Sequence, residues 1–152
     1  MFKRVAASVV AVGAVAVVWA SAATGATGSQ RFTISGSNNG GHVYASGPIS
    51  GSGRDVVLGQ NADKFIFPAG SVLVSHHATS QSDNFDPRSC MDRFTESGTY
   101  SLSSGTGAYK GVTGSGTYTA KGVARGTRTA SGCSMNPKSR YLVNASGWTK
   151  LP

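Results

Sequence analysis

The sequence predicts an all-β fold: a closed antiparallel barrel of eight strands that carries one disulfide. Three observations support this prediction. The chain has 21 glycines together with many Ser and Thr residues, and strong helix formers are scarce. Short runs of β-type residues are bounded by Gly, Pro or Asn, and no run has a helical period. With no helix to cover an exposed sheet edge, a closed barrel is favoured over an open sheet.

The first 22 residues have the layout of a signal peptide. Lys3 and Arg4 precede an uncharged apolar run over 5–19, and small residues with an A-x-A spacing follow. The run is shorter than the ~20 residues that span a bilayer, and no basic cluster follows it. We therefore expect cleavage after Ala22, or as late as Ala26, and a secreted, extracellular protein without a stable membrane anchor.

The remaining chain is long enough for a single domain with one modest core. Residues 23–29 are mostly small and read as a flexible leader, so the domain is expected over 30–152. Its eight strands are expected over 31–35, 42–50, 55–58, 64–67, 71–78, 93–103, 114–124 and 140–148. The polar segment 79–91 contains Asp86-Pro87 and is expected to be an ordered loop, a lid or rim pinned at its end by Cys90.

The clearest alternation lies in residues 117–122. Tyr118, Ala120 and Gly122 share one face, and Thr117, Thr119 and Lys121 share the other. This pattern predicts a strand with one buried face and one face in water.

Cys90 and Cys133 are the only cysteines, and an oxidising compartment lets such a pair form a bridge. We predict that they are bonded. Neither has a second Cys or a His at metal-ligand spacing, so neither a metal site nor a catalytic thiol is expected.

Charge is unevenly distributed along the chain. Residues 23–96 carry five basic and six acidic side chains, whereas residues 97–152 carry seven basic and no acidic ones. If the later strands are neighbours, one flank of the domain is basic. An anionic extracellular polymer is therefore one candidate partner, and no nucleic-acid partner is expected.

The stretch 98–118 (GTYSLSSGTGAYKGVTGSGTY) resembles the glycine-rich hairpin of allene oxide cyclase-like and dirigent-like β-barrel proteins. The GPISG run at 47–51 and the D-P-x-x-C run at 86–90 are also similar to secreted bacterial members. The resemblance implies an eight-stranded barrel with an apolar lumen open at one end, without metal or organic cofactor.

The glycines of this hairpin are expected to have a structural role. They permit positive φ angles, bulges and close backbone approach where a strand turns back at a barrel rim. The residues concerned are Gly105, Gly107, Gly111, Gly114 and Gly116, with Tyr100, Tyr109 and Tyr118 expected to pack around the turn.

His76 is the first candidate for chemistry. It is adjacent to His77, so in a strand the two point to opposite faces. His76 shares its face with Val72 and Val74, which would place its imidazole in the lumen as a general acid or base. A hydrogen-bonded, structural histidine is the alternative.

Glu96 is the second candidate. It alternates in phase with Tyr100 and Leu102, provided that no bulge intervenes at Gly98. A carboxylate on an inward face would have a raised pKa. We expect instead that Gly98 shifts the register and leaves Glu96 in water beside an arginine.

The sequence contains neither a G-x-S-x-G elbow nor a phosphate loop, so hydrolases and nucleotide-binding proteins are not predicted. Three functions remain: an accessory or small-apolar-molecule-binding extracellular protein, a cofactor-free cyclase, isomerase or dirigent-like guide, and attachment to an anionic polymer. The second would use lumen groups, for which His76, Glu96 and Tyr118 are the candidates. The first two differ in whether the lumen holds convergent polar groups or is filled by its own side chains.

Overall fold

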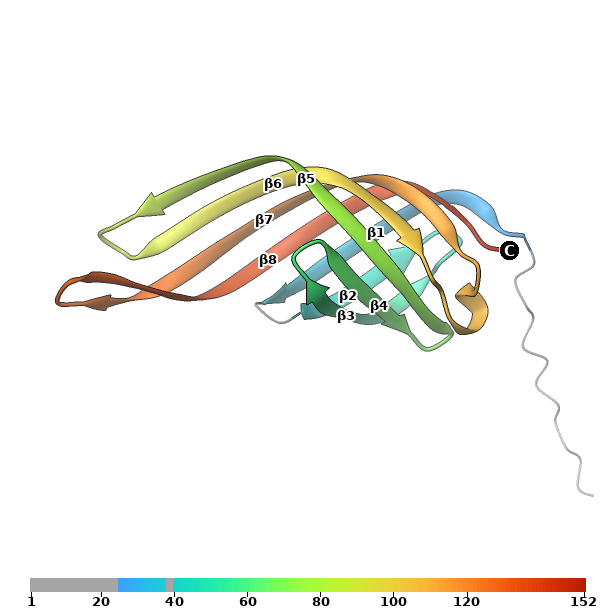
Figure 1. Cartoon of the computed structure of the whole chain (residues 1–152), viewed down its shortest axis with the longest axis horizontal. Helices are drawn as coiled ribbons and strands as arrows, with labels where there is room; N and C mark the ends of the chain where they lie inside the picture. Colours follow the sequence, from blue (N-terminus) through green and yellow to red (C-terminus); the bar gives the residue numbers. More distant parts are fainter. Residues whose placement is uncertain (1–24, 38–39) are drawn as a thin grey trace, which may run out of the picture.

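The chain folds as one antiparallel sheet that closes on itself, because its first strand pairs with its last (Figure 1). The computed structural model describes residues 25–37 and 40–152, with the side chains of 135–138 outside the description. Within these ranges the strands are β1 (Thr27–Ser37), β2 (Gly40–Ser46), β3 (Gly51–Gly59), β4 (Ala62–Phe67), β5 (Gly70–Asp86), β6 (Met91–Ser103), β7 (Thr113–Thr129) and β8 (Gly132–Lys150). A single short 3-10 helix, η1 (Gly107–Tyr109), precedes β7. The predicted all-β class and the closed ring of antiparallel strands are thus confirmed.

The observed strands are mostly longer than the predicted ones. β1 begins at Thr27, so the last residues of the predicted flexible leader are paired, Thr27 with Lys150 and Ser29 with Trp148. The predicted signal peptide, residues 1–22, lies outside the described residues.

The prediction of a loop over 79–91 was wrong. β5 continues to Asp86 and stays paired with β6 up to Met91, so only residues 87–90 form a turn. Residues 79–85 are exposed on both faces, which removes the apolar alternation by which strands are recognised. Backbone pairing to β6 keeps this segment extended.

Alternate residues of the strands point inward and form the core. Phe32 of β1 packs on Phe65 of β4 and on Tyr100 of β6, with ring centroids 5.3 Å and 6.0 Å apart. At one end of the ring, buried residues outside the strands close the interior. They are Ile49, Tyr109, Val112 and Leu151, each at most 5% exposed.

Gln30 is a fully buried polar residue that holds this closed end together. Its Nε2 donates to the carbonyls of Ile49 (2.9 Å) and Ser46 (3.1 Å), and its Oε1 accepts from the Ile49 backbone N–H (2.9 Å). Both the nitrogen and the oxygen of the buried amide have hydrogen-bond partners, which offset the cost of removing the amide from water. Gln30 therefore holds the turn between β2 and β3 against β1.

The glycine-rich segment before β7 was only partly predicted. Gly107 and Gly111 adopt positive φ angles of 59° and 81°, and Tyr109 packs edge-on against Phe67 at 5.9 Å. Tyr100 and Tyr118, however, lie inside the ring rather than around this turn. Gly105, Gly114 and Gly116 instead allow close backbone approach.

Strands β5 to β8 continue well beyond the ring as two long hairpins (Figure 1). The β5–β6 hairpin remains paired to Asp86 and Met91, and the β7–β8 hairpin to Thr129 and Gly132. β6 and β7 pair with each other from Leu102 out to Met91, so the hairpins form one four-stranded extension of the sheet.

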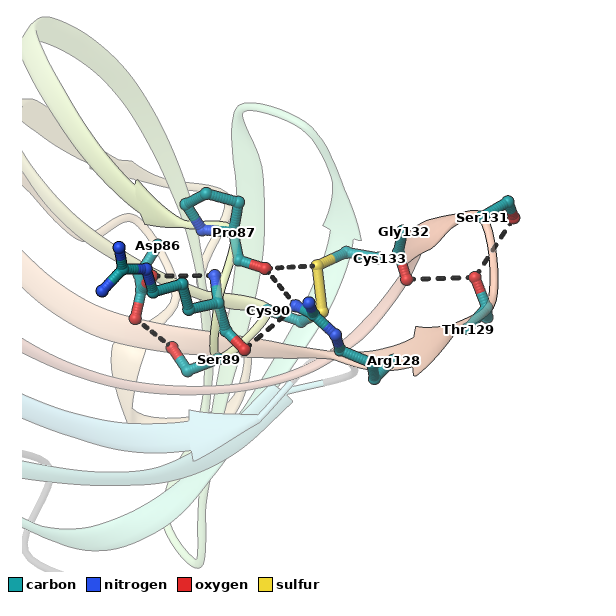
Figure 2. Close-up of a disulfide and its surroundings, with 10 residues drawn as sticks. Asp86, Pro87, Ser89, Cys90, Arg128, Thr129, Ser131, Gly132 and Cys133 are labelled. Carbon is teal, nitrogen blue, oxygen red and sulfur yellow. Dashed lines mark hydrogen bonds between the residues drawn. A yellow bond between two sulfur atoms is a disulfide. The ribbon is translucent and has the colours of Figure 1, made fainter.

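A disulfide ties the two hairpins together near their tips (Figure 2). Cys90 ends the turn between β5 and β6, and Cys133 lies at the start of β8, with a Cα–Cα distance of 5.4 Å. Arg128 of β7 adds hydrogen bonds to the carbonyl oxygens of Pro87 and Arg88. The predicted disulfide is confirmed, and it staples the part of the sheet that has no core beneath it.

Replacing both cysteines by serine should lower the free energy of unfolding by about 4 kcal/mol, the chain-entropy value for a loop of 43 residues. Urea denaturation of the oxidised wild type and the C90S/C133S variant measures the difference. Wild-type protein reduced with dithiothreitol is the matched control and should behave like the variant. A loss below about 1 kcal/mol would contradict the stapling role.

Candidate functional site

Glycines on neighbouring strands make room for the aromatic rings inside the ring of strands. A Cβ atom on Gly98 would lie 2.8 Å from the ring of Tyr118, and one on Gly116 would lie 2.7 Å from the ring of Tyr100. Both distances are too short for real side chains. Each ring therefore occupies the space above a glycine of the adjacent strand.

The interior contains a cavity of about 260 Å³, near the lower end of the range for small-molecule sites. It opens beside the turn between β3 and β4, where Gly59 and Gln60 line it. Its lining is mostly apolar, with Val57, Val74 and Val143 among the aliphatic side chains. The described lining also includes six aromatic rings, those of Phe32, Phe65, Phe94, Tyr100, Tyr118 and Tyr141.

Three polar pairs lie in this cavity. Tyr118 Oη donates to Glu96 Oε1 (2.6 Å), Tyr141 Oη donates to Asp55 Oδ2 (3.3 Å), and His76 Nε2 lies 3.3 Å from Asp63 Oδ2. The imidazole of His76 also packs edge-on against the Tyr118 ring, 5.9 Å between centroids. The interior thus holds convergent polar groups and is not filled by its own side chains.

All three residues singled out in the sequence, His76, Glu96 and Tyr118, line this one cavity. Their predicted chemistry is a separate matter and stays a prediction. The expected face of His76 is confirmed, since Val74 and His76 both line the cavity and Val72 is buried, whereas Leu73 is half-buried and Ser75 is exposed.

The expectation that Gly98 shifts the register and leaves Glu96 in water was wrong. Pairing between β6 and β7 is continuous from Met91 to Leu102, and the irregularity lies on the other side, between Ala78 and Ser80 of β5. The Tyr118 ring fills the space beside Gly98, so the glycine serves close packing rather than a bulge.

Sequence analysis missed Asp55, Asp63 and Tyr141. Two of them had a signal that could have identified them, because Asp63 alternates in phase with Phe65 and Tyr141 alternates in phase with Val143. Asp55 begins a short predicted strand in which the sequence does not show which side chains point inward. Its inward position becomes evident only from its pairing with Phe65.

Asp55 is the least solvated carboxyl group of the site, with only 6% of its surface exposed. Burial, together with the nearby charge of Asp63, raises its pKa to about 6, although the Tyr141 hydrogen bond and His76 act in the opposite direction. Its Oδ1 has no hydrogen-bond partner among the described residues. Asp55 therefore changes charge near neutral pH and has a free acceptor.

The other groups have defined protonation tendencies. The hydrogen bond that His76 donates to Asp63 raises the pKa of His76, which favours the imidazolium form. Burial and the Glu96 carboxylate raise the pKa of Tyr118, and burial and Asp55 do the same for Tyr141. Both phenols are therefore neutral donors toward carboxylates.

The outer face of the sheet has the opposite charge from the interior. Arg93 and Arg140 flank Val123 across three adjacent strands, and Lys121 and Arg125 lie two residues to either side on β7. All four cations are exposed. The expected basic flank thus lies on the outside of β6 to β8, while attachment of an anionic polymer to it stays a prediction.

Comparisons with protein-family models, curated proteins and solved structures give no match. Among the described residues, no helix is long and apolar enough to cross a membrane. The same part of the chain has no group of three or more His, Cys, Asp or Glu side chains placed to hold a metal ion. The cavity is therefore interpreted from its own residues.

Replacing Asp55 by Asn should stabilise the protein at pH 7.5 by up to about 3 kcal/mol, the equivalent of a pKa raised from 3.8 to about 6. The folded state binds this proton more tightly than the unfolded state, so wild-type stability falls as the pH rises from about 4 to about 6. The gain should vanish below pH 4. Asp63, His76 and Tyr141 are the ionisable groups that face Asp55.

Guanidinium denaturation at pH 3.5 and pH 7.5 measures this difference. Asp83→Asn is the control, because Asp83 is exposed on the extension and should change stability little at either pH. An Asp55→Asn variant that is less stable than wild type at pH 7.5 would contradict the burial of an uncompensated carboxylate.

Proposed function

We propose that this chain is a secreted β-barrel protein that binds a small, largely apolar molecule inside its ring of strands. The observation that carries the proposal is the open interior cavity, which combines an aromatic lining with a few placed polar groups. The closed eight-stranded ring and the glycine-rich segment before β7 are consistent with an allene oxide cyclase-like or dirigent-like barrel.

Two features support secretion. The first residues have the charged, apolar and small-residue regions of a signal peptide. The Cys90–Cys133 disulfide forms and persists in an oxidising compartment.

Unsatisfied groups in the cavity support a ligand with a polar end. Asp55 Oδ1 and Tyr100 Oη are both buried and lack hydrogen-bond partners among the described residues. A buried polar atom without a partner costs about 1–3 kcal/mol. A ligand that places a polar group beside either of them and its apolar body among the aromatic rings would recover part of that cost.

The fluorescent alcohol 2-naphthylmethanol, which has an apolar body and one hydroxyl, tests the proposal. We expect saturable binding at micromolar to millimolar concentrations. Ala120→Phe should weaken it at least tenfold, because Ala120 lines the cavity and the larger side chain would fill it. Fluorescence titration measures the affinity.

Thr119→Phe is the matched control, since it adds the same ring one residue away on the exposed face and should leave binding unchanged. Thermal melts of both variants establish that each is folded. Equal affinity in wild type and Ala120→Phe, or no saturable binding of any naphthyl probe, would overturn the proposal. Native mass spectrometry of the secreted protein then identifies a retained ligand.

A second candidate function, a cofactor-free isomerase or cyclase, is favoured by the state of Asp55. A carboxylate with a pKa of about 6 in an apolar site is a suitable general base, and the neutral hydroxyl of Tyr118 is a suitable donor. The polar pairs supply both components.

The base-sensitive probe 5-nitrobenzisoxazole tests this second function. A base removes the proton from its C3, the N–O bond breaks, and the product is a coloured phenolate. Wild type should accelerate this reaction over acetate buffer, with a rate that rises with pH through about 6. Asp55→Asn should abolish the acceleration and Asp86→Asn should not. A rate equal to that of buffer would argue against a reactive base.

A further inference from the structure

We propose that the cavity is a site for an organic cation: its ligand carries a protonated amine on an apolar, ring-bearing body. This inference rests on the proposed binding function and adds the chemical class of the ligand. It follows from the charges, the unsatisfied acceptors and the aromatic rings that the cavity brings together.

The charge balance of the cavity is negative. Three carboxyl groups line it, those of Asp55, Asp63 and Glu96, and His76 is the one group among the described lining residues that can carry a positive charge. His76 is already paired with Asp63. Two carboxylates therefore have only tyrosine hydroxyls as partners, and a buried charge without a counterion is unfavourable.

Two residues of the cavity lining carry buried oxygen atoms without a hydrogen-bond partner among the described residues. Asp55 is more than nine-tenths buried, and its Oδ1 has no partner in the described part of the chain. The hydroxyl of Tyr100, a residue only 5% exposed, is likewise unpartnered. An ammonium group offers three N–H donors for such acceptors, whereas a carboxylate ligand offers none to Asp55.

The aromatic lining favours the same ligand class. The faces of Phe and Tyr rings attract cations within about 6 Å, more strongly when water is excluded. Phe32, Phe65 and Tyr100 are packed together as the inner wall, and Tyr118 and Tyr141 carry the hydroxyls that hold the carboxylates. An alkylammonium group with an aromatic body would contact rings and carboxylates at once.

The approach to the cavity is also acidic. Asp92 and Asp83 lie on the same face of the extension as Phe94, which lines the cavity, because Asp83 pairs with Phe94 and Asp92 precedes it by two residues. Arg93, Lys121, Arg125 and Arg140 lie on the opposite face. The inner face of the extension therefore attracts cations toward the cavity although the chain as a whole is basic.

Three naphthyl probes of matched size test the inference: 2-naphthylmethylamine, the neutral 2-naphthylmethanol and the anionic 2-naphthoate. At pH 7.5 and 0.15 M salt, calorimetry should give an affinity for the amine at least tenfold higher than for the alcohol, with the anion weakest. Nonspecific attraction to a protein of net positive charge would give the reverse order for the two ions.

Variants of single carboxyl groups test whether the preference for the amine arises in the cavity. Asp55→Asn and Glu96→Gln should each lower the ratio of the affinity for the amine to that for the alcohol at least fivefold. Asp86→Asn removes an equal charge at the distant turn and should change neither. Equal binding of amine and alcohol, both blocked by Ala120→Phe, would overturn the cation assignment and leave the binding function intact. Binding of none of the probes would overturn both.

Discussion

The pairing of β1 with β8 closes the sheet, and the cavity with its buried polar groups depends on that closure. Register is maintained from Thr27 and Lys150 at one end to Ser37 and Arg140 at the other. A closed sheet has no free edge along these strands and separates an inside from an outside. Glycines such as Gly98 and Gly116 then let Tyr118 and Tyr100 pack against neighbouring strands, and the centre is left open on one side.

Closure of the sheet also separates the charged side chains by sign, with basic residues on the outer face and carboxyl groups in the interior. Arg93, Lys121 and Arg140 alternate with inward residues and are exposed, so their charges remain solvated by water. Asp55 and Glu96 point inward, where desolvation is costly and tyrosine hydroxyls compensate it only in part. A chain that is basic overall therefore encloses an acidic cavity. That combination of burial and incomplete compensation is typical of a binding site rather than of a core designed for stability.

Local pattern was sufficient for the strands that have one buried face. The alternation around Tyr118 and Ala120 predicted a real strand with the correct face inward. It failed over 79–86, where both faces meet water and only pairing with β6 defines the strand. The Cys90–Cys133 bond followed from composition and the expected compartment. Whether Glu96 faces the interior depends on whether the strand has a bulge at Gly98. The sequence alone does not show this, because the role of Gly98 is to make room for the Tyr118 ring of the neighbouring strand.

The cavity was predicted in part for a similar reason. His76, Glu96 and Tyr118 lie on strands in which the alternation of apolar residues shows which side chains point inward. The inward position of Asp55 is evident only from the pairing of its strand with the next one.

Carboxyl-carbon NMR titration of Asp55 is the measurement that tests the account most directly, because a desolvated, incompletely compensated carboxyl group has a raised pKa. The account predicts a pKa of about 6. A pKa near the ordinary value of 3.8 would contradict it, because Asp55 would then be solvated or fully compensated.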